Sequence, residues 1–491
     1  MNKIPVTIRL VLVAICLINF AICEIRFAFE MFRHGARGPL NIKQDGKDIY
    51  GETWNHDGEL TEVGMRQHYL IGYRNRQKYK NFLSTSFDPK EMYVISTNVN
   101  RTIMSAYSQL QGLFPDGTGP ELNEKQLNYA LPPIGDVDYS EEIKRLGKNA
   151  LPNKSDAYPI HLFDYNARYF YLRDSKVCPG IAPLIKENLK KEILKNYMDN
   201  FNQTYGETFQ KILNVNSTYF YDYWSMYGIA DTFVSDVTQG KELNVLKDAG
   251  IDFEKFNKTA FEFLEIDILE IGVGDKDKII PLVSMSPIVL DVLKWMEVRI
   301  KNDINSIGYN GFESPKFVMY SAHDVEMGAI QLYLNSTLTY PDIYYTPFAS
   351  SIFFELYRPD NVENPSKLTE DDYEVLINYN DHFTKLPFTE FKKGISENSY
   401  DAEKVASVCQ FNGNSSSSTG YVIATFSLGV ITLGLIIYVV YNIYKNRKNQ
   451  EFVEPVPDAG GPRCLGVDER HVQHVNRHLL AVSTTSTYNN V

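Results

Sequence analysis

The sequence predicts an α/β fold, built as one large domain with a substantial insertion or a second lobe. Three apolar runs have the character of strands, and each is followed by charged residues; two of them continue into stretches with helical spacing. Two apolar terminal segments frame residues 24–410, a length that exceeds what one small core requires.

The first strand is predicted in EIRFAFEMF, residues 24–32. Its apolar residues alternate with others: Ile25, Phe27, Phe29 and Met31. The stretch RHGARGP follows at once and carries Arg33 and Arg37. Ligands of open α/β sheets bind at the carboxyl ends of strands, and arginines offer forked donors to an anion such as phosphate. An ordinary solvated turn is the alternative for this stretch taken alone.

Two further runs place charged residues at strand ends. KFVMYSAHD ends in His323 and Asp324, and the next apolar residues have helical spacing: Met327, Ile330 and Leu334. Residues 91–114 change from strand to helix around Arg101, with an apolar stripe that we expect in the core: Ile103, Tyr107, Leu110 and Phe114. Arg101 begins this helix, where a cation opposes the helix dipole, so it requires another reason to be there.

The two ends of the chain predict membrane targeting. Residues 1–23 have the basic, apolar and small-residue order of a signal peptide cleaved after Cys23, with a retained anchor as the alternative. Residues 421–444 contain an uncharged apolar run long enough to span a bilayer, and basic residues follow it. We therefore expect a luminal domain at 24–410, a flexible Ser-rich stem at 411–420 and a cytosolic tail at 445–491.

Glycosylation sequons and cysteines fit an oxidising compartment. Six sequons are predicted to carry glycans: Asn153, Asn202, Asn216, Asn257, Asn335 and Asn414. Cys178 and Cys409 are the only cysteines between the two terminal segments, and we expect them to form a disulfide. The net charge of −12 argues against nucleic acid as a partner.

At this point four ordered blocks resemble a known family. RHGARGP is similar to the RHGxRxP motif of the histidine acid phosphatases, and SAHD is similar to their second motif, which carries a His-Asp pair. The segments 58–79 and 96–106 also match. The resemblance runs from Ile25 to Cys409, and its layout is closest to the membrane-anchored lysosomal and prostatic members.

The resemblance implies a fold like that of phosphoglycerate mutase. A mixed central sheet is flanked by helices, and a smaller helical domain is inserted at roughly 125–290, with one transmembrane helix at the C-terminal end. Members of the family join cysteines at positions resembling Cys178 and Cys409. They also form dimers, which makes a homodimer the expected assembly.

The resemblance also implies a chemistry. His34 would attack phosphorus to form a phosphohistidine, and Asp324 would act as the general acid, which favours an acid optimum. The phosphoryl oxygens would be bound by a set of four side chains: Arg33, Arg37, Arg101 and His323. No metal or cofactor is required, and the substrates are small phosphomonoesters. The alternatives are a phytase-like inositol phosphate phosphatase and a catalytically inactive surface receptor with the same fold.

Some positions depart from the family pattern. Close relatives have Arg in place of Ile95 and Thr in place of Val325, and the position of Ala36 often holds Asp. A seventh sequon, at Asn100, lies beside Arg101, so we expect it to be unmodified. His56 and His68 receive no chemical role.

The tail ends in Tyr488–Val491, which has the form of a sorting signal read by an adaptor, with a chance match as the alternative. It favours a lysosomal or endosomal membrane and leaves the cell surface open.

Overall fold

The computed structural model describes residues 23–55, 57–134, 137–163, 176–269, 278–309, 313–338, 340, 346–360, 362 and 364–410. All of these described residues belong to one compact unit. The first 22 residues of the predicted leader, the stem, the membrane span, the tail, His56 and the sequon at Asn414 lie outside the described residues. Cys23, the predicted last residue of the leader, is the first residue of strand β1.

A seven-stranded mixed sheet forms the centre of the fold, in the order β3-β2-β4-β1-β5-β6-β7. Strands β3, β2, β4 and β1 run parallel, whereas β5, β6 and β7 continue the sheet in antiparallel pairs. The strands are β1 Cys23–Arg33, β2 Met92–Ser96, β3 His161–Leu162, β4 Phe317–Ala322, β5 Ser351–Pro359, β6 Glu374–Tyr379 and β7 His382–Pro387.

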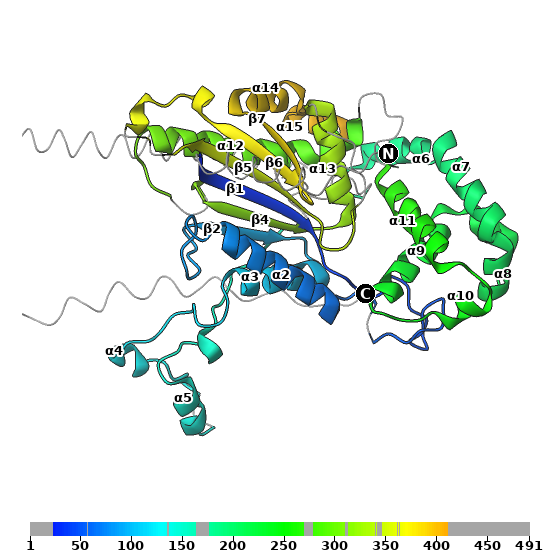
Figure 1. Ribbon diagram of the computed structural model, residues 1–491, viewed down its shortest axis with the longest axis horizontal. Coiled ribbons are helices and arrows are strands. Elements are labelled where there is room, and N and C mark those ends of the chain that lie inside the picture. The colour runs from blue at the N-terminus through cyan, green and yellow to red at the C-terminus, as the bar shows by residue number, and fades with distance from the viewer. Residues whose placement is uncertain are drawn as a thin grey trace, which may run out of the picture. The chain divides into compact units, whose positions relative to one another are not determined.

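Helices cover both faces of this sheet, as Figure 1 shows. The α-helices are α2 Glu62–Lys78, α3 Asn100–Leu113, α4 Glu124–Leu127, α5 Ser140–Leu146, α6 Ala182–Asn188, α7 Glu192–Phe201, α8 Glu207–Leu213, α9 Tyr223–Thr238, α10 Asn244–Asp248, α11 Phe253–Leu269, α12 Ile279–Ile304, α13 Asp324–Thr337, α14 Phe388–Asn398 and α15 Ala402–Val408. The predicted α/β class with a mixed central sheet is confirmed.

The alternation in β1 separates the two faces. Phe27, Phe29 and Met31 pack with α12 to α15, as the sequence pattern predicts, whereas Ala28 and Phe32 pack with α2 and α3. The pattern is wrong at Ile25, which packs on the second face because the register shifts between Ile25 and Phe27. Because both faces are covered, the strand is buried on both sides. Glu30 points to the face of α2 and α3 and is fully buried there.

Helices α7 to α11 build a second apolar core, rich in aromatic side chains. Tyr50, from the loop after β1, belongs to this core. Two parts of the predicted insertion at 125–290 lie with the sheet and outside the second core: β3 joins the sheet, and the first turns of α12 pack on it. The second core therefore draws on residues 194–263 together with the loop after β1.

The stripe predicted for α3 is wrong at Tyr107, whose side chain is 44% exposed. The buried face of α3 instead carries mostly small or polar residues, because α2 crosses it closely. A Cβ on Gly72 of α2 would lie 1.9 Å from the carbonyl oxygen of Gln109, and one on Gly112 would lie 2.0 Å from that of Tyr69. Close backbone contact selects small residues and leaves the tyrosine outside.

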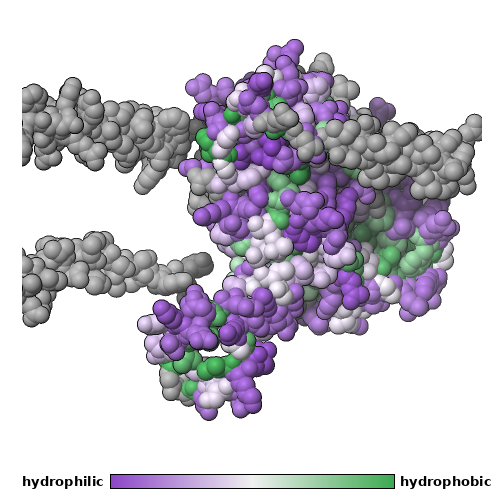
Figure 2. All heavy atoms as spheres, turned by 60° about the vertical axis from the view of Figure 1, so that its left-hand side comes forward, coloured by the Kyte–Doolittle hydropathy of each residue, from purple (hydrophilic) through white to green (hydrophobic). Residues whose placement is uncertain are grey.

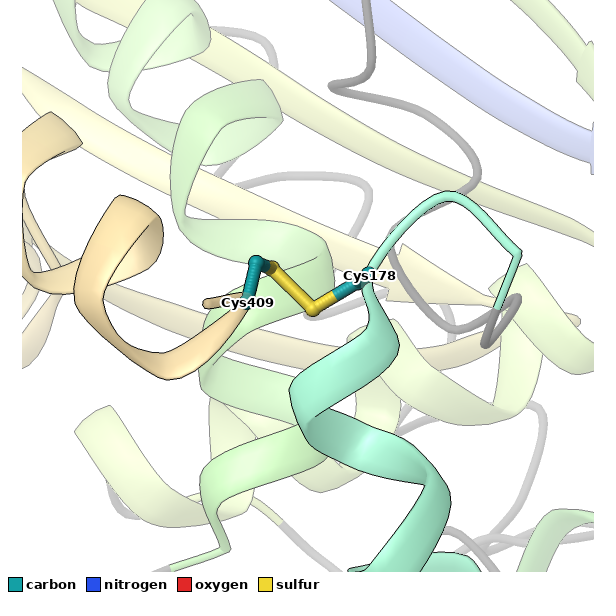
Figure 3. The surroundings of a disulfide bond; sticks show 2 residues. All are labelled: Cys178 and Cys409. Atoms are coloured by element: carbon teal, nitrogen blue, oxygen red, sulfur yellow. A yellow bond between two sulfur atoms is a disulfide. The ribbon is translucent and has the colours of Figure 1, made fainter. Parts of the chain in front are cut away.

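The predicted disulfide between Cys178 and Cys409 is present (Figure 3). Both cysteines are fully buried in the core that packs on the sheet. The bond ties the start of the helical region to the end of the described chain, and it closes a loop of 231 residues. A cross-link over so long a loop restricts the unfolded chain strongly.

Among the described residues, α12 alone is long and apolar enough to cross a membrane, but 72% of its most apolar window is buried inside the fold. Exposed apolar side chains gather instead in the excursion that carries α4 and α5: Tyr129, Leu131, Ile134, Val137 and Ile143. Figure 2 shows apolar surface on this excursion between its polar residues.

The close crossing of α2 and α3 predicts that Gly112→Ala destabilises the protein. Overpacking costs about 1–3 kcal/mol and exceeds the gain of about 1 kcal/mol in helix propensity. Urea unfolding measures the difference. Gly308→Ala is the matched control, because nothing lies within 4 Å of the Cβ it would add. Equal stability of the two variants would contradict the crossing.

Candidate functional site

The carboxyl ends of β1 and β4 lie side by side because these strands pair in parallel at the centre of the sheet. Arg33 at the end of β1 pairs with Ala322 at the end of β4. The backbone N–H of His34 donates to the carbonyl oxygen of Ala322 at 3.0 Å. His323 and Asp324 follow directly. The two sequence motifs therefore meet at one edge of the sheet.

The loop after β1 is fixed by close backbone packing against α2. A Cβ on Gly35 would lie 2.5 Å from the carbonyl oxygen of Gly64, and one on Gly64 would lie 2.2 Å from that of Ala36. Thr61, which caps α2, donates to the Ala36 carbonyl from its backbone N–H at 3.0 Å and its hydroxyl at 2.9 Å. The motif glycine is needed for this approach.

His34 lies buried in the site with one ring nitrogen bound. Its Nδ1 lies 2.9 Å from the carbonyl oxygen of Gly35, so Nδ1 carries the hydrogen and Nε2 carries the lone pair. Burial, followed by the nearby positive charges of Arg33 and Arg37, lowers the pKa of His34 well below its usual value. The neutral form of the imidazole is therefore favoured.

Two arginines of the motif have buried partners. Arg33 donates to the carbonyl oxygen of Thr346 at 2.6 Å and forms an ion pair with Asp324 at 2.7 Å. Arg37 forms a bidentate pair with Asp231 of α9, at 2.7 and 3.1 Å. The ring of Phe348 faces both guanidinium groups, at 4.3 and 5.7 Å from its centroid.

Arg101 and His323 complete the group. Nη2 of Arg101 lies 3.5 Å from Nδ1 of His323, and the hydroxyl of Thr97 lies 3.0 Å from Nε2 of the same ring. The rings of His34 and His323 are 5.4 Å apart. Burial, and then repulsion by Arg37, lowers the pKa of Arg101 to about 10. The positive charge of Arg101 is unfavourable at the start of α3, because it opposes the helix dipole, unless an anion lies nearby.

The structure thus brings together all six residues that the sequence predicts for the site: Arg33, His34, Arg37, Arg101, His323 and Asp324. Asp324 occupies the first position of α13, where a negative charge is favoured by the helix dipole. Three guanidinium groups around a neutral imidazole form a cradle suited to a tetrahedral anion.

Two residues of the site were not predicted, Asp231 and Phe348. Asp231 is buried in α9 among apolar residues. A charged residue inside such a run is a signal that sequence reasoning can use, because an acid is rarely buried without a partner. Phe348 follows a segment without a clear periodic pattern, and we find no sequence signal for it.

The departures from the family pattern lie at the margins of the site. Ile95 of β2 and Val325 of α13 are both buried in the apolar core beside the sheet. Asn100 is exposed, and its amide donates to Glu59 at 3.0 Å.

The other described sequons differ in exposure. Asn153 and Asn216 are exposed, whereas Asn202, Asn257 and Asn335 are half-buried. Within the described residues, no three His, Cys, Asp or Glu side chains are grouped as a metal site.

A pair of buried carboxyl groups joins the loop after β1 to α9. The indole N–H of Trp54 donates to Asp48 at 2.9 Å and to Asp236 at 3.0 Å. Lys241 pairs with Asp236 at 3.2 Å and lies over the Trp54 ring. Burial, and then the charge of Asp48, raises the pKa of Asp236 to about 8. In acid, Asp236 therefore holds a proton in the folded protein.

This pair predicts a pH dependence of stability. The unfolded chain releases the proton of Asp236 near its ordinary pKa of about 4, so the free energy of unfolding falls as pH rises from about 4 to about 8. Asp236→Asn keeps the neutral form and should reduce this fall, measured as melting temperature at pH 5 and 8. Asp248→Asn, at an exposed position of α10, is the control. An unchanged fall in Asp236→Asn would disprove the assignment.

The sequence and the fold are similar to those of known proteins. Residues 24–378 match the sequence model of the histidine phosphatase superfamily (branch 2). The chain is 29% identical over 344 residues to a lysosomal acid phosphatase of Xenopus laevis, a match that covers 67% of this chain and 66% of that protein. It is 26% identical over 355 residues to a prostatic acid phosphatase of Mus musculus, covering 71% and 79%. A solved structure of a Hafnia alvei phytase with myo-inositol hexakis sulphate aligns with a TM-score of 0.49 at 14% identity, covering 80% of this chain and 100% of that one.

Proposed function

The chain belongs to the histidine phosphatase superfamily (branch 2), and from this membership we propose that it is an acid phosphatase that hydrolyses phosphate monoesters through a phosphohistidine. The observation that carries the proposal is a neutral, buried His34 among three guanidinium groups. Its Nδ1 is held by Gly35, so Nε2 presents the lone pair that a nucleophile requires.

The proposed reaction has two displacements at phosphorus. Nε2 of His34 attacks the phosphoryl group, the bond to the ester oxygen breaks, and Asp324 gives its proton to the leaving alcohol. Water then attacks the phosphohistidine while Asp324 accepts a proton, which releases phosphate and restores His34. Arg33, Arg37, Arg101 and His323 stabilise the charge on the phosphoryl oxygens in both transition states.

Asp324 has to change partners during this cycle. Its carboxylate pairs with Arg33 at 2.7 Å, and that pair favours the ionised acid. A phosphate monoester would compete for Arg33, because its oxygens are better bidentate acceptors for the same guanidinium. Binding of substrate therefore frees Asp324 to take a proton, which fits activity in acid.

We propose the following organisation: a signal peptide at 1–23, a luminal domain at 24–410 with its helical insertion at roughly 125–290, a stem at 411–420, a membrane helix at 421–444 and a cytosolic tail at 445–491. The luminal sequons other than Asn100 carry glycans, and the chain forms a homodimer. A lysosomal or endosomal membrane is the proposed location, supported by the names of the relatives and by the sorting pattern at Tyr488–Val491. The partner that reads the sorting pattern at Tyr488–Val491 would be an adaptor protein.

The proposed roles predict the effect of two substitutions on hydrolysis of an aryl phosphate by the detergent-solubilised full chain at about pH 5. His34→Ala should abolish turnover, and Asp324→Ala should lower kcat by about 10²–10⁴-fold. Acid quenching during turnover should trap a phosphoenzyme in the wild type and not in His34→Ala. His161→Ala, at an exposed position on β3, serves as the control. A folded but inactive wild type would favour the receptor alternative.

The placement of Asn100 next to Arg101 predicts that this sequon is unmodified. A glycan there would obstruct the phosphate-binding group, and the amide already donates to Glu59. Mass spectrometry of glycopeptides from an active preparation tests the prediction, with the exposed sequon at Asn216 as the comparison. A glycan on Asn100 in fully active protein would contradict the role of Arg101.

A further inference from the structure

Four buried polar side chains form a chain of contacts behind the loop that carries His34. They are Glu30 of β1, His68 and Asn75 of α2, and Gln109 of α3, and all four are fully buried. The Gln109 amide donates to Glu30 Oε2 at 2.7 Å, and the Asn75 amide donates to the same oxygen at 2.9 Å. Nδ1 of His68 lies 3.0 Å from Gln109 Oε1.

The other end of this chain touches the site. Nε2 of His68 lies 3.1 Å from the carbonyl oxygen of Arg33, the residue that precedes the proposed nucleophile. The His68 ring also packs on Phe32, with ring centroids 5.0 Å apart. His68 thus reaches the backbone of the motif from behind, on the face of the sheet that α2 and α3 cover.

The hydrogen bonds among these four side chains and to Arg33 can all form only if the group holds one extra proton, which Glu30 and His68 share. Both nitrogens of His68 face oxygen acceptors, so with Gln109 donating to Glu30 the ring must be an imidazolium and Glu30 a carboxylate. If the Gln109 amide turns over, it donates to Nδ1, and its oxygen accepts from a protonated Glu30. Both arrangements hold the same number of protons, and both keep the N–H of His68 on Arg33.

The environment favours the second arrangement in acid. Burial raises the pKa of Glu30 to about 7, and the amides of Gln109 and Asn75 together with the charge of Arg74 oppose this only partly. Burial lowers the pKa of His68 to about 4. Tyr79, at the end of α2, also faces Glu30 and is bound to Glu355 of β5. At about pH 5 the proton therefore rests on Glu30.

We propose that Glu30, Gln109 and His68 form a positioning relay, in which one proton held by Glu30 keeps a His68 N–H on the Arg33 carbonyl and so fixes the loop that carries His34. When the relay loses this proton, Glu30 binds the Gln109 amide and His68 has a single N–H for two acceptors. The ring nitrogen without a hydrogen then faces an oxygen acceptor, either Gln109 Oε1 at 3.0 Å or the Arg33 carbonyl oxygen at 3.1 Å. Because the two lone pairs repel each other, the ring must shift away from that oxygen.

The inference rests on the proposed phosphatase function and is tested with Glu30→Gln, which keeps a neutral donor in place of the protonated acid. A group with a pKa of about 7 is about 10% protonated at pH 8, so the relay lowers wild-type kcat about tenfold between pH 5 and 8. Glu30→Gln should lack this tenfold part of the fall and keep only the part that comes from Asp324, with KM little changed. The ratio of kcat at the two pH values is the measurement.

Glu355→Gln is the matched control, because Glu355 is also a buried acid of the sheet but binds Lys78, Tyr79 and Tyr357. It should alter stability and leave the kcat ratio as in the wild type. His68→Gln retains an amide donor for Arg33 and should keep activity, whereas His68→Leu should lower kcat at every pH. Identical ratios in wild type and Glu30→Gln would overturn the relay.

A readout without turnover separates this inference from the proposed function. In NMR spectra of the full chain with isotope-labelled histidine, the ring signals of His68 are assigned by their loss in His68→Gln. Their chemical shifts should change with pH in the wild type, with a midpoint near pH 7. In Glu30→Gln they should be constant over that range. An inactive wild type with this titration would refute the phosphatase proposal alone, and a titration unchanged by Glu30→Gln would refute the relay alone.

Discussion

Burial of positive charge at the edge of the sheet is the constraint on which the rest of the site depends. Arg33, Arg37 and Arg101 lie close together and largely out of water, which is unfavourable unless negative charge balances it. Asp231 of α9 and Asp324 of α13 supply that charge. The second, aromatic core therefore contributes to the site, because it fixes α9 and so positions Asp231, the partner of Arg37.

The site is supported by different means from the helical region and from the face of the sheet that α2 and α3 cover. On one side, α9 contributes Asp231, and the Asp48–Asp236 pair joins it to the loop after β1. On the other side, α2 crosses close to Gly35, and His68 reaches the Arg33 carbonyl. Because the loop is held by backbone contacts and by protonated side chains at once, its geometry is linked to the acidity of its surroundings.

The sequence predicts those features that depend on local pattern. The period of two in β1, the ends of the two motifs and the count of cysteines each led to a feature that is confirmed. Tyr107 was placed wrongly because the close crossing of two helices at Gly72 and Gly112 overrides apolar spacing. Asp231 and Glu30 were missed because their partners come from distant segments, although a single acid within a buried run gives a usable signal in each.

The charge balance of the site bears on the kind of substrate it suits. Among the described residues of the site, two of the three guanidinium groups are paired with carboxylates, and His34 is neutral. The net positive charge that remains is small. A substrate with many phosphates would need further cations around the pocket, whereas one phosphate needs only the groups present. Arg101, whose pKa falls to about 10 next to Arg37, gains most from the incoming dianion. Under the proposed function, binding of one phosphate dianion would relieve the repulsion between Arg37 and Arg101 and would displace Asp324 from Arg33, so the described residues of the site suit a simple phosphate monoester.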